Sequence, residues 1–421
     1  MAFLRIFFGV LLSLLVLSGC HPAPRTTLRL ALWIPNEEMV SLKKQVDEFE
    51  SENPSCRVEI VQSASSEETR QKITADLARG APPDVSMISA KDLLWWTQSQ
   101  ALVDLGRFHP NEFDFQSDLI QAFKRGGKLY ALPCGWSTLV LYYNKELFLK
   151  QGIPFPLTTW HWSDLLRAAE SLTVIDDQGE TQQFGLELDP ELEAWAPFIW
   201  QNHGEIVRQD GSWCLTDPQY LQSNLQAIDF YAALSREFHA AVVDVNSKHA
   251  PFFDQKAAMA FGHRDLGREL TIKNRFDWDI VPLPRGETTA STLEVFGYAV
   301  CSQSAQPDMA YKLAQFLTRE TVQAAMIQRG WYAPAHLVLF ASKIFLDFPG
   351  ADPANNRALL NSLSTARVPA YGSHIPQAFQ IMREEMLSLL GDTNASSRVT
   401  LEQMQVRLEE LNLLSHTVKN P

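Results

Sequence analysis

Aromatic and polar side chains lie together at the ends of two strands that the sequence predicts. Trp33 and Asn36 fall where the apolar stretch 28–34 meets a helical pattern, and Ser89 and Lys91 end a second such stretch. Ligands of open α/β sheets bind at the carboxyl ends of the strands. An aromatic ring covers a flat apolar face of a solute, while amide, hydroxyl and ammonium groups pair with its polar atoms. The pattern therefore predicts capture of a small polar molecule, with packing in a core as the alternative for each tryptophan.

The motifs of common enzymes are absent from the sequence, which contains no HExxH, no Walker loop and no GxGxxG. The cysteines after residue 20 are scattered, without a CxxC or a metal-ligand spacing; they are Cys56, Cys134, Cys214 and Cys301. The sequence does not choose among the possible disulfide pairings, and buried free thiols are the simplest interpretation. We therefore expect no metal, no cofactor and no catalysis.

The composition is that of an acidic globular protein. The 421 residues are 46% apolar and 20% charged, which argues against extensive disorder. A chain of this length is too long for one ordinary hydrophobic core and suits two domains. We expect the protein to be a monomer. The formal net charge is −13. Because an acidic chain repels phosphate backbones, nucleic acid is not an expected partner.

The amino-terminal segment has the pattern of a secretory signal. A single early arginine is followed by the apolar run 6–17, which is short for a membrane span of roughly 20 residues. The run ends in "LSGC", which resembles the bacterial lipobox, whose cysteine is lipidated. We therefore expect residues 1–20 to be a signal peptide and residues 21–27 a tether. Cys20 would anchor the protein outside the cytoplasm, on a bacterial membrane. A plain signal or an anchor with an incidental cysteine is the alternative.

The first part of the remaining sequence alternates between strand and helix patterns. Strands are expected at 28–34, 57–61 and 84–89, and helices at 36–53 and 66–80. The side chain at position 36, an asparagine, suits an N-cap. This order is typical of an α/β lobe with a largely parallel sheet.

A different pattern follows. Two extended pieces, Lys128–Pro133 and Thr138–Tyr143, are separated by Cys134–Ser137 and by no helix. Further along, helices are expected at 163–172, 218–238 and 307–330, the last as one long helix or two abutting ones, and a strand is expected at 293–302. The last ninety or so residues are mostly helical by pattern.

Several segments resemble, in order, the extracellular solute-binding proteins of bacterial ABC importers, in the sugar-binding group that includes maltose- and glycerol-phosphate-binding proteins. Any one segment would be a weak match, but seven in order make a specific one, while the part after residue 340 matches only loosely. The segments are "LWIPNEEMVSLKKQVDEFESENP", "ITADLARGAPPDV", "GGKLYALPCGWSTLVLYYNKELFLKQG", "TTWHWSDLLRAAESLT", "FFDQKAAMAFG", "IVPLPRG" and "AYKLAQFLTRETVQAAMIQRGWYAPAH".

The resemblance implies an α/β fold of the two-lobed, periplasmic-binding-protein-like kind. Each lobe would be a mainly parallel sheet flanked by helices, and crossover strands would join the lobes with a ligand cleft between them. Lobe one would comprise residues 28–137 plus 297–335, and lobe two residues 138–296 plus 336–421. The return crossing would be Val295–Tyr298.

The resemblance also implies which residues contact the ligand. Trp136 and Ser137 would lie at the first crossover and face the cleft. Other positions match segments near the cleft in relatives, and with the strand-end residues above they complete the expected site: Trp195, Trp200, Asn202, His203, His263, Arg264, Glu294, Phe296, Trp331, Tyr332 and Tyr371. The implied function is capture of a sugar or oligosaccharide by hinge closure and delivery to the permease of an ABC importer.

Other residues near the expected site have simpler structural explanations. Asp84 is expected to order the turn before its strand, and Trp95 and Trp96 to pack in a helix. Glu37 and Glu38 fit the preference for acidic residues at a helix N-terminus.

Three further functions stay open at this point. A glycerol-phosphate-type solute is the alternative ligand, although only Lys91, Arg264 and backbone amides are obvious partners for a phosphate, and an arginine is more often in a surface ion pair. A sensor or scaffold without transport would use the same closed state. A secreted glycan-cleaving enzyme has the least support, because it needs two carboxylates flanking one bond and no segment supplies such a pair.

Overall fold

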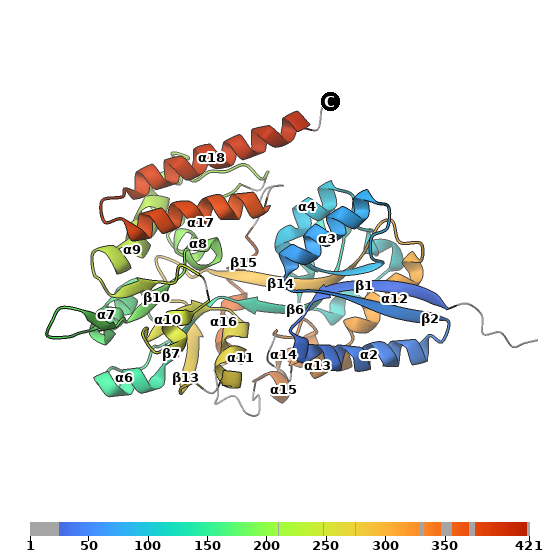
Figure 1. The fold of residues 1–421 in the computed structure, drawn as a ribbon, viewed down its shortest axis with the longest axis horizontal. Helices are drawn as coiled ribbons and strands as arrows, with labels where there is room; N and C mark the ends of the chain where they lie inside the picture. Colours follow the sequence, from blue (N-terminus) through green and yellow to red (C-terminus); the bar gives the residue numbers. More distant parts are fainter. Residues whose placement is uncertain are drawn as a thin grey trace, which may run out of the picture.

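Two α/β lobes lie side by side along the longest axis of the molecule (Figure 1). This computed structural model describes residues 25–208, 210–246, 248–273, 275–327, 330, 332–346, 356–369 and 375–418. The predicted signal peptide, its Cys20 and most of the predicted tether lie outside the described residues. Within the ranges given, no helix combines the length and the apolar character needed to cross a membrane.

The sheet of lobe one is parallel on one side and antiparallel on the other. Its strands are β1 (Thr26–Trp33), β2 (Cys56–Ser63), β3 (Val85–Ser89), β6 (Leu132–Thr138), β14 (Ser291–Val300) and β15 (Ala366–Arg367). The order is β15-β14-β3-β1-β2, and β6 also pairs with β14. β1 runs parallel to β2 and β3, whereas β14 runs antiparallel to β3 and β6. The expected parallel pairing therefore holds for β2-β1-β3, and the crossing strands depart from it.

The sheet of lobe two is mixed in the same way. Its strands are β7 (Val140–Asn144), β10 (Leu186–Leu188), β11 (Ala241–Val243), β12 (Met259–Gly262) and β13 (Trp278–Pro282), in the order β11-β10-β12-β7-β13. β10 is parallel to β11 and β12, while β7 is antiparallel to both of its neighbours. Two hairpins stand apart from the sheets: β4 (Lys124–Arg125) with β5 (Lys128–Leu129), and β8 (Val174–Ile175) with β9 (Thr181–Gln183).

Strands connect the two sheets without an intervening helix. β6 ends at Thr138 and β7 begins at Val140, so a single residue separates the two sheets there. β14 returns to the first sheet and pairs with β15, β6 and β3 in turn. The stretch Cys134–Ser137, expected to interrupt two extended pieces, is instead the interior of β6. The lobe boundary expected after residue 137 lies next to this junction and stays a prediction, and α14 and α15, which fall in the segment expected in lobe two, lie with the helices of lobe one.

Helices cover the lobe-one sheet. They are η1 (Asn36–Glu38), α2 (Met39–Glu52), α3 (Ser66–Ala78), η2 (Ala90–Asp92), α4 (Leu93–Gln98), η3 (Leu105–Phe108), η4 (Glu112–Asp114), α5 (Ser117–Gln121), α12 (Pro307–Leu317), α13 (Glu320–Ile327), α14 (Leu337–Phe340) and α15 (Lys343–Leu346). The region 307–330 thus forms two helices, the second of the two predicted arrangements.

The helices of lobe two include two long ones from the end of the chain. In Figure 1, α17 and α18, drawn in red, pack over α8 and α9 at the outer side of this lobe, while α16 lies where the two sheets meet. The helices are α6 (Lys145–Gln151), α7 (Trp162–Leu172), α8 (Leu192–Gln201), α9 (Leu221–Arg236), α10 (Ala250–Phe253), α11 (Arg264–Lys273), α16 (Arg357–Leu363), α17 (Ile375–Gly391) and α18 (Ser397–Val418).

Side-chain caps explain some helix starts and correct one prediction. The Ser65 hydroxyl accepts from the Glu68 backbone N–H at the start of α3, and serine is one of the residues that favour this position. Asn36, predicted as an N-cap, lies inside η1 and caps nothing there. Its amide oxygen instead accepts from Nε2 of Gln62 (3.1 Å). The reason is that a 3-10 turn precedes α2, so the helix begins three residues later than the pattern indicated.

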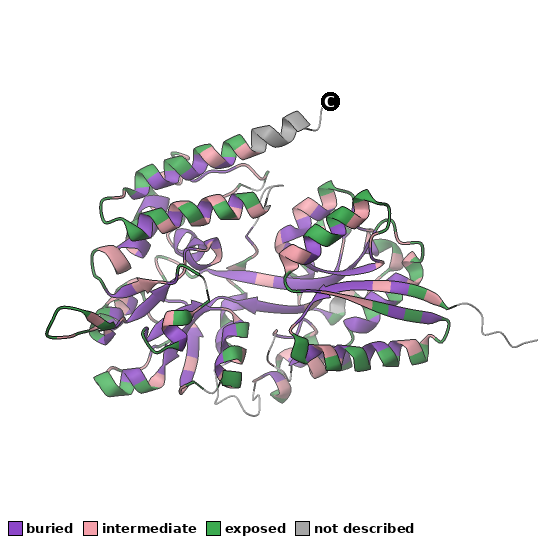
Figure 2. Cartoon of the chain, viewed as in Figure 1, coloured by how far each residue is buried: buried purple, intermediate pink, exposed green. Residues whose placement is uncertain are grey.

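Strand β7 separates two hydrophobic cores. Tyr142 belongs to a core that continues through Trp136 into lobe one, whereas Leu141 and Tyr143 belong to the second core, under α8 and α9. β7 is buried on both faces, which is why its sequence reads as a continuous apolar run. β6 and β14 are likewise buried along most of their length (Figure 2).

Candidate functional site

The paired strands β14 and β6 present different side chains on their two faces. Glu294 lies opposite Ser137, and Val295 lies opposite Trp136. Because successive residues of a strand point to opposite faces, Glu294, Ser137 and Phe296 share one face, and Trp136 and Val295 share the other. Trp136 and Ser137 therefore cannot both face a ligand, although both were expected to do so.

The indole of Trp136 is part of the core, which corrects the expectation that it faces the cleft. It is 0% exposed, and its Nε1 donates to the carbonyl oxygen of Pro334 (2.6 Å). The rings of Phe340 and Phe345 pack against it at centroid distances of 5.7 and 6.4 Å. The tryptophan between two extended pieces thus joins β6 to the helices that follow residue 336.

Three aromatic rings form a continuous row on the other face of these strands. The ring centroids of Trp33 and Phe296 are 5.8 Å apart, and those of Phe296 and Tyr332 are 4.4 Å apart. Tyr332 fits against β6 because residue 135 is glycine, where a Cβ would lie 2.7 Å from the Cβ of Tyr332. Ser89, another predicted site residue, lies opposite Phe296 in the β3–β14 ladder. Trp33 and Phe296 are buried in this conformation, at 9% and 6% exposure, and Tyr332 is half-buried; we call these three residues the aromatic row.

Lys91 connects the two lobes. From η2 its Nζ lies 3.3 Å from Oε1 of Glu193 on α8 and 5.2 Å from the ring centroid of Phe379 on α17. Burial opposes its charge, but the attraction of Glu193, Glu294 and Asp92 outweighs burial and raises the pKa of Lys91 above its usual range. The ammonium group is therefore charged at all physiological pH values and already has carboxylate partners.

A second polar contact connects the lobes. Nη2 of Arg268, on α11, lies 3.4 Å from Oε2 of Glu37 and 3.8 Å from Oε1 of Glu38, both on η1. The side chains of Arg268 and Glu38 are 10% and 2% exposed, so this contact is largely withdrawn from water. Glu37 and Glu38 do begin a helical segment as predicted, and they also hold the lobes together.

Glu294 and His263 face each other between these two contacts and have unused hydrogen-bonding capacity. Nδ1 of His263 is 3.7 Å from Oε2 of Glu294, which is too long for a hydrogen bond. Both ring nitrogens of His263 are buried without a hydrogen-bond partner among the described residues, and the Glu294 side chain is 27% exposed. We call the aromatic row together with Lys91, Glu193, His263 and Glu294 the interlobe site.

Arg264, also predicted to contact ligand, directs its guanidinium group away from Glu294. Its backbone N–H donates to the Ser137 hydroxyl (2.9 Å), and its side chain packs over the ring of Phe345 at 5.1 Å. Nε and Nη1 donate to the Gly330 carbonyl (3.3 Å) and to Oδ1 of Asn356 (3.5 Å). Burial lowers the pKa of Arg264 to about 10, so it stays charged at neutral pH. The same phenylalanine contacts Trp136, so this cation belongs to the core side of β6.

The tryptophans predicted on α8 pack in the core of lobe two, which corrects their expected role. Trp195 is 0% exposed, and its Nε1 donates to the Pro190 carbonyl (3.1 Å). Trp200 is also buried and donates to Oε1 of Glu205 (3.2 Å). The physical reason is that α8 is buried on nearly every side, beneath α9 and α17, so its rings have no free face.

Asn202 and His203 follow α8 and are not part of the interlobe site. Nδ2 of Asn202 donates to the Ser223 carbonyl (2.9 Å) and to Oε1 of Gln226 (3.1 Å). His203 is exposed and has a left-handed backbone, with φ of 59°. These residues shape the turn that leads from α8 toward α9. Trp331 and Tyr371 lie outside the described residues, and their roles stay predictions.

Three residues of the interlobe contacts were not predicted. Glu193 lies in the first turn of α8, Arg268 lies one helical turn after Arg264, and Phe379 lies on α17. An acidic residue in a first helical turn is common for reasons unrelated to ligands, so Glu193 carried no distinctive signal. Phe379 could not be assigned because the carboxyl-terminal segment matched the family only loosely.

Two structural predictions outside the site are confirmed. Asp84 orders the turn before β3, because Oδ2 accepts from the Arg29 backbone N–H (2.9 Å) and Oδ1 from the Ser304 hydroxyl (2.5 Å). Trp96 is buried at 1% exposure, and the half-buried Trp95 packs edge-on against it at a centroid distance of 4.6 Å. The cysteines at 56, 134, 214 and 301 are free thiols, and all except the second are fully buried. Among the described residues, no group of three or more His, Cys, Asp or Glu side chains is arranged to hold a metal ion.

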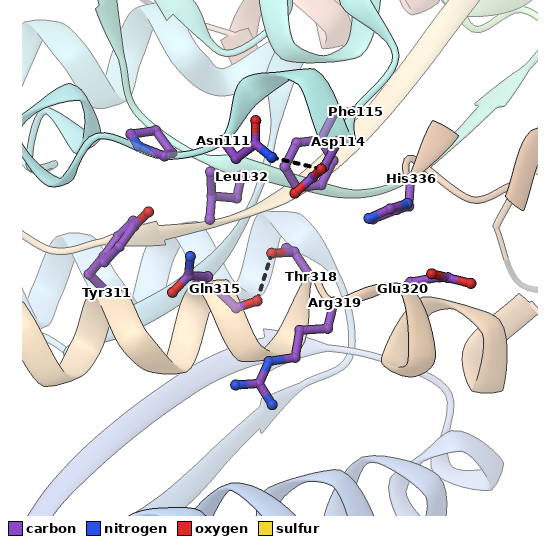
Figure 3. Close-up of a pocket in the computed structure, with 11 residues that line it drawn as sticks. Asn111, Asp114, Phe115, Leu132, Tyr311, Gln315, Thr318, Arg319, Glu320 and His336 are labelled. Atoms are coloured by element: carbon purple, nitrogen blue, oxygen red, sulfur yellow. Dashed lines mark hydrogen bonds between the residues drawn. The ribbon is translucent and has the colours of Figure 1, made fainter. Parts of the chain in front are cut away.

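A separate hollow of about 290 Å³ lies within lobe one (Figure 3). It is bounded by η4 on one side and by the end of α12 and the start of α13 on the other. Its ion pair and its hydrogen bonds are internal to the lobe: Arg319 pairs with Glu52 (3.0 Å), and Asn111 donates to Asp114 (2.9 Å). Among the described residues, none of the predicted site residues lines it, and no residue of the second sheet or of its helices does.

The lobes, the crossing strands and the interlobe site define a two-lobed binding protein, and solved structures share this fold. An ABC substrate-binding protein from Listeria monocytogenes, in complex with cycloalternan, matches with a TM-score of 0.80 at 21% identity, covering 92% of this chain and 99% of that chain. UgpB from Mycobacterium tuberculosis, in complex with glycerophosphocholine, matches with a TM-score of 0.77 at 22% identity, covering 92% and 98% of the two chains.

Sequence comparison gives the family. The family model for the bacterial extracellular solute-binding protein matches residues 35–324, so the chain belongs to that family, as its segments predicted. A galactooligosaccharide-binding protein from Bacillus subtilis is 23% identical over 328 residues, 73% of this chain and 74% of that protein. A putative binding protein from Brucella abortus is 29% identical over 180 residues, which span only 42% of either chain.

Proposed function

We propose that this protein is the solute-capturing component of an ABC importer and that its solute is a sugar or oligosaccharide bound at the interlobe site. The observation that carries the proposal is the aromatic row beside Glu294 and His263, whose hydrogen-bonding capacity is unused. A sugar has flat C–H faces that rings cover and a rim of hydroxyl groups that pair with carboxylate and imidazole. Family membership and the shared two-lobed fold support the same function.

Capture would proceed by closure of the lobes. In the described part of the chain, two sets of ion pairs connect the lobes at the site, Lys91 with Glu193 and Arg268 with Glu37 and Glu38. The strands that join the sheets would act as the hinge, because the junction between β6 and β7 is a single residue. A ligand that touches both lobes favours the closed state by the difference between its affinities for the two states.

Delivery would require two further features that we also propose. The permease would recognise the closed form through surfaces on both lobes of a monomer. Lipidation at Cys20, directly after the predicted signal, would hold the protein on the extracytoplasmic face of a bacterial membrane. Mass spectrometry of the protein purified from membranes tests this point, since an unmodified Cys20 would contradict it.

A phosphate-bearing solute is less compatible with the site. Lys91 and Arg268 already have carboxylate partners, and the guanidinium group of Arg264 lies on the core side of β6. A phosphate would have to displace these partners and would lie near Glu294 as well.

Thermal unfolding against a panel of solutes tests the proposal. The panel contains sugars, oligosaccharides, polyols and glycerol phosphates. A ligand at 100 times its Kd stabilises the native state by about 2.7 kcal/mol and raises Tm measurably. We expect one class of sugar to do so without being cleaved over hours. If no solute of the panel raises Tm, or if the sugar is cleaved, the proposal is wrong.

A further inference from the structure

In the described interlobe contacts given above, carboxylates outnumber cations. Glu37, Glu38, Glu193 and Glu294 face Lys91 and Arg268 in the contacts described above, and each of these two cations has a carboxylate within 4 Å. Each of those cations is therefore already neutralised by a partner from the opposite lobe. The charge that is left over at the interlobe site is negative.

Glu294 is a carboxylate without a close ion pair or hydrogen bond among the described residues. In the part of the chain that the structure describes, its one ion-pair contact is the 3.7 Å approach to Nδ1 of His263, and no residue there donates a hydrogen bond to its oxygens. Lys91 acts on Glu294 through space but lies in contact with Glu193. A half-buried carboxylate in this position gains most from a ligand group that is both positively charged and a hydrogen-bond donor.

The aromatic row begins next to this carboxylate. Phe296 follows Glu294 by two residues on the same face of β14, a separation of about 7 Å along a strand. The ring of Tyr332 lies against that of Phe296 at a centroid distance of 4.4 Å, with the two planes tilted by 31°. A cation bound at Glu294 would therefore lie on the face of β14 that carries the ring of Phe296, and aromatic faces attract cations.

We propose that the solute is a sugar that carries a positively charged amino group, with the ammonium on Glu294 and the ring on Phe296 and Tyr332. This inference rests on the proposed function, because it names the class of sugar for the same site. It specifies a charged sugar, whereas the proposed function leaves the charge of the sugar unspecified. It also excludes phosphorylated solutes, because the net negative charge of the interlobe site repels a phosphate.

The test compares three disaccharides that share one skeleton and differ in charge. They are the β-1,4-linked glucosamine disaccharide, its fully N-acetylated form and cellobiose, titrated calorimetrically into wild-type protein at a pH where the amines are protonated. One charge-assisted hydrogen bond is worth about 1.5–3 kcal/mol, so we expect the amino sugar to bind roughly 10- to 100-fold more tightly than the other two. This comparison needs no variant and so cannot fail through misfolding.

The variant Glu294→Gln keeps the shape and removes the charge. We expect it to abolish the preference for the amino sugar, so that the three disaccharides bind with similar affinity, because an amide carries no charge to attract the ammonium group. Glu287→Gln is the matched control, because Glu287 is exposed in the loop before β14 and the substitution changes net charge equally. The control should bind all three sugars as wild type does.

The other outcomes overturn the inference in distinguishable ways. Equal or tighter binding of cellobiose or of the acetylated sugar by wild type contradicts it and leaves the proposed function standing. Retention of the amino-sugar preference in Glu294→Gln contradicts the assigned contact. Binding of glycerol 3-phosphate but of none of the three sugars also contradicts the inference. If neither these solutes nor any sugar of the wider panel binds, both the inference and the proposed function are wrong.

Discussion

At the scale of single residues, adjacent residues of one strand have different roles because their side chains point to opposite faces of the sheet. Trp136 points into the core, whereas Ser137 lies on the face with Glu294 and Phe296. The aromatic types that could stack on a sugar were visible in the sequence, but their direction was not. The sequence pattern of β6 has no polar alternation, since both of its faces are buried.

Substitution of Trp136 should therefore affect stability. Trp136→Ala removes a fully buried indole and the hydrogen bond to the Pro334 carbonyl, so we expect the unfolding free energy to fall by about 3–5 kcal/mol. Urea unfolding, followed by circular dichroism, measures the change. A variant with wild-type stability and impaired ligand binding would show instead that this ring faces the ligand.

A buried histidine and glutamate predict how stability depends on pH. Nδ1 of His249 lies 2.6 Å from Oε1 of Glu187 in lobe two. Burial opposes the charge of the imidazole, but the hydrogen bond and the charge of Glu187 raise the pKa of His249 above 6.5. Burial also raises the pKa of Glu187. In both cases the folded state binds more protons than the unfolded state, so the unfolding free energy falls as pH rises.

The corresponding measurement is Tm as a function of pH. The contribution of His249 is complete below 6.5 and is lost as pH rises through its raised folded pKa. We expect His249→Gln to flatten the fall of Tm above that pH, whereas His203→Gln, at an exposed histidine, should leave it unchanged. An identical slope in wild type and His249→Gln would contradict the assignment.

At the scale of elements, much of the α/β order could be predicted, and the departures have physical causes. The repeating strand and helix patterns of residues 28–89 gave β1, α2, β2, α3 and β3 within a few residues. The antiparallel direction of β14 could not be predicted from its own apolar run, since the pairing depends on β3, which is some 200 residues away. Of the predicted site residues, those at strand ends and on β14 lie close together in the structure. The predicted tryptophans on α8 pack in the core of lobe two. Whether a helical tryptophan is exposed depends on what packs over it, here α9 and α17.

Gly297 is predicted to be essential to the β14–β6 ladder. A Cβ at this position would lie 2.7 Å from both the Leu132 carbonyl oxygen and the ring of Phe123. Gly297→Ala should therefore lower the unfolding free energy by about 1–3 kcal/mol, because the two strands must move apart. Gly391→Ala is the control, since a Cβ there meets nothing within 4 Å. Equal urea midpoints for the two variants would contradict this account of the ladder.

At the scale of the whole molecule, contacts between the lobes set how readily the protein closes. Arg268 bridges α11 to η1, and Glu38 would be left buried without this partner. We expect Arg268→Ala to shift the unliganded protein toward open conformations and to raise the Kd for the ligand roughly two- to tenfold. Small-angle X-ray scattering reports the first effect as an increased radius of gyration, and calorimetry reports the second.

The matched control breaks an ion pair within one lobe. Arg319 contacts both carboxylate oxygens of Glu52 at 3.1 and 3.0 Å, and both residues belong to lobe one. Arg319→Ala should leave the radius of gyration and the Kd unchanged. The interlobe account would be wrong if both variants scattered and bound alike.

The most direct test of ligand capture between the lobes is a calorimetric titration of the best solute from the panel into wild type, Phe296→Ala and Val295→Ala. These two residues are adjacent on β14 but face opposite sides. We predict that Phe296→Ala raises Kd at least about tenfold, since it removes an aromatic contact with the ligand. Val295→Ala should lower Tm and leave Kd unchanged. Wild-type affinity in Phe296→Ala would contradict a ligand site on this face of the crossing strands.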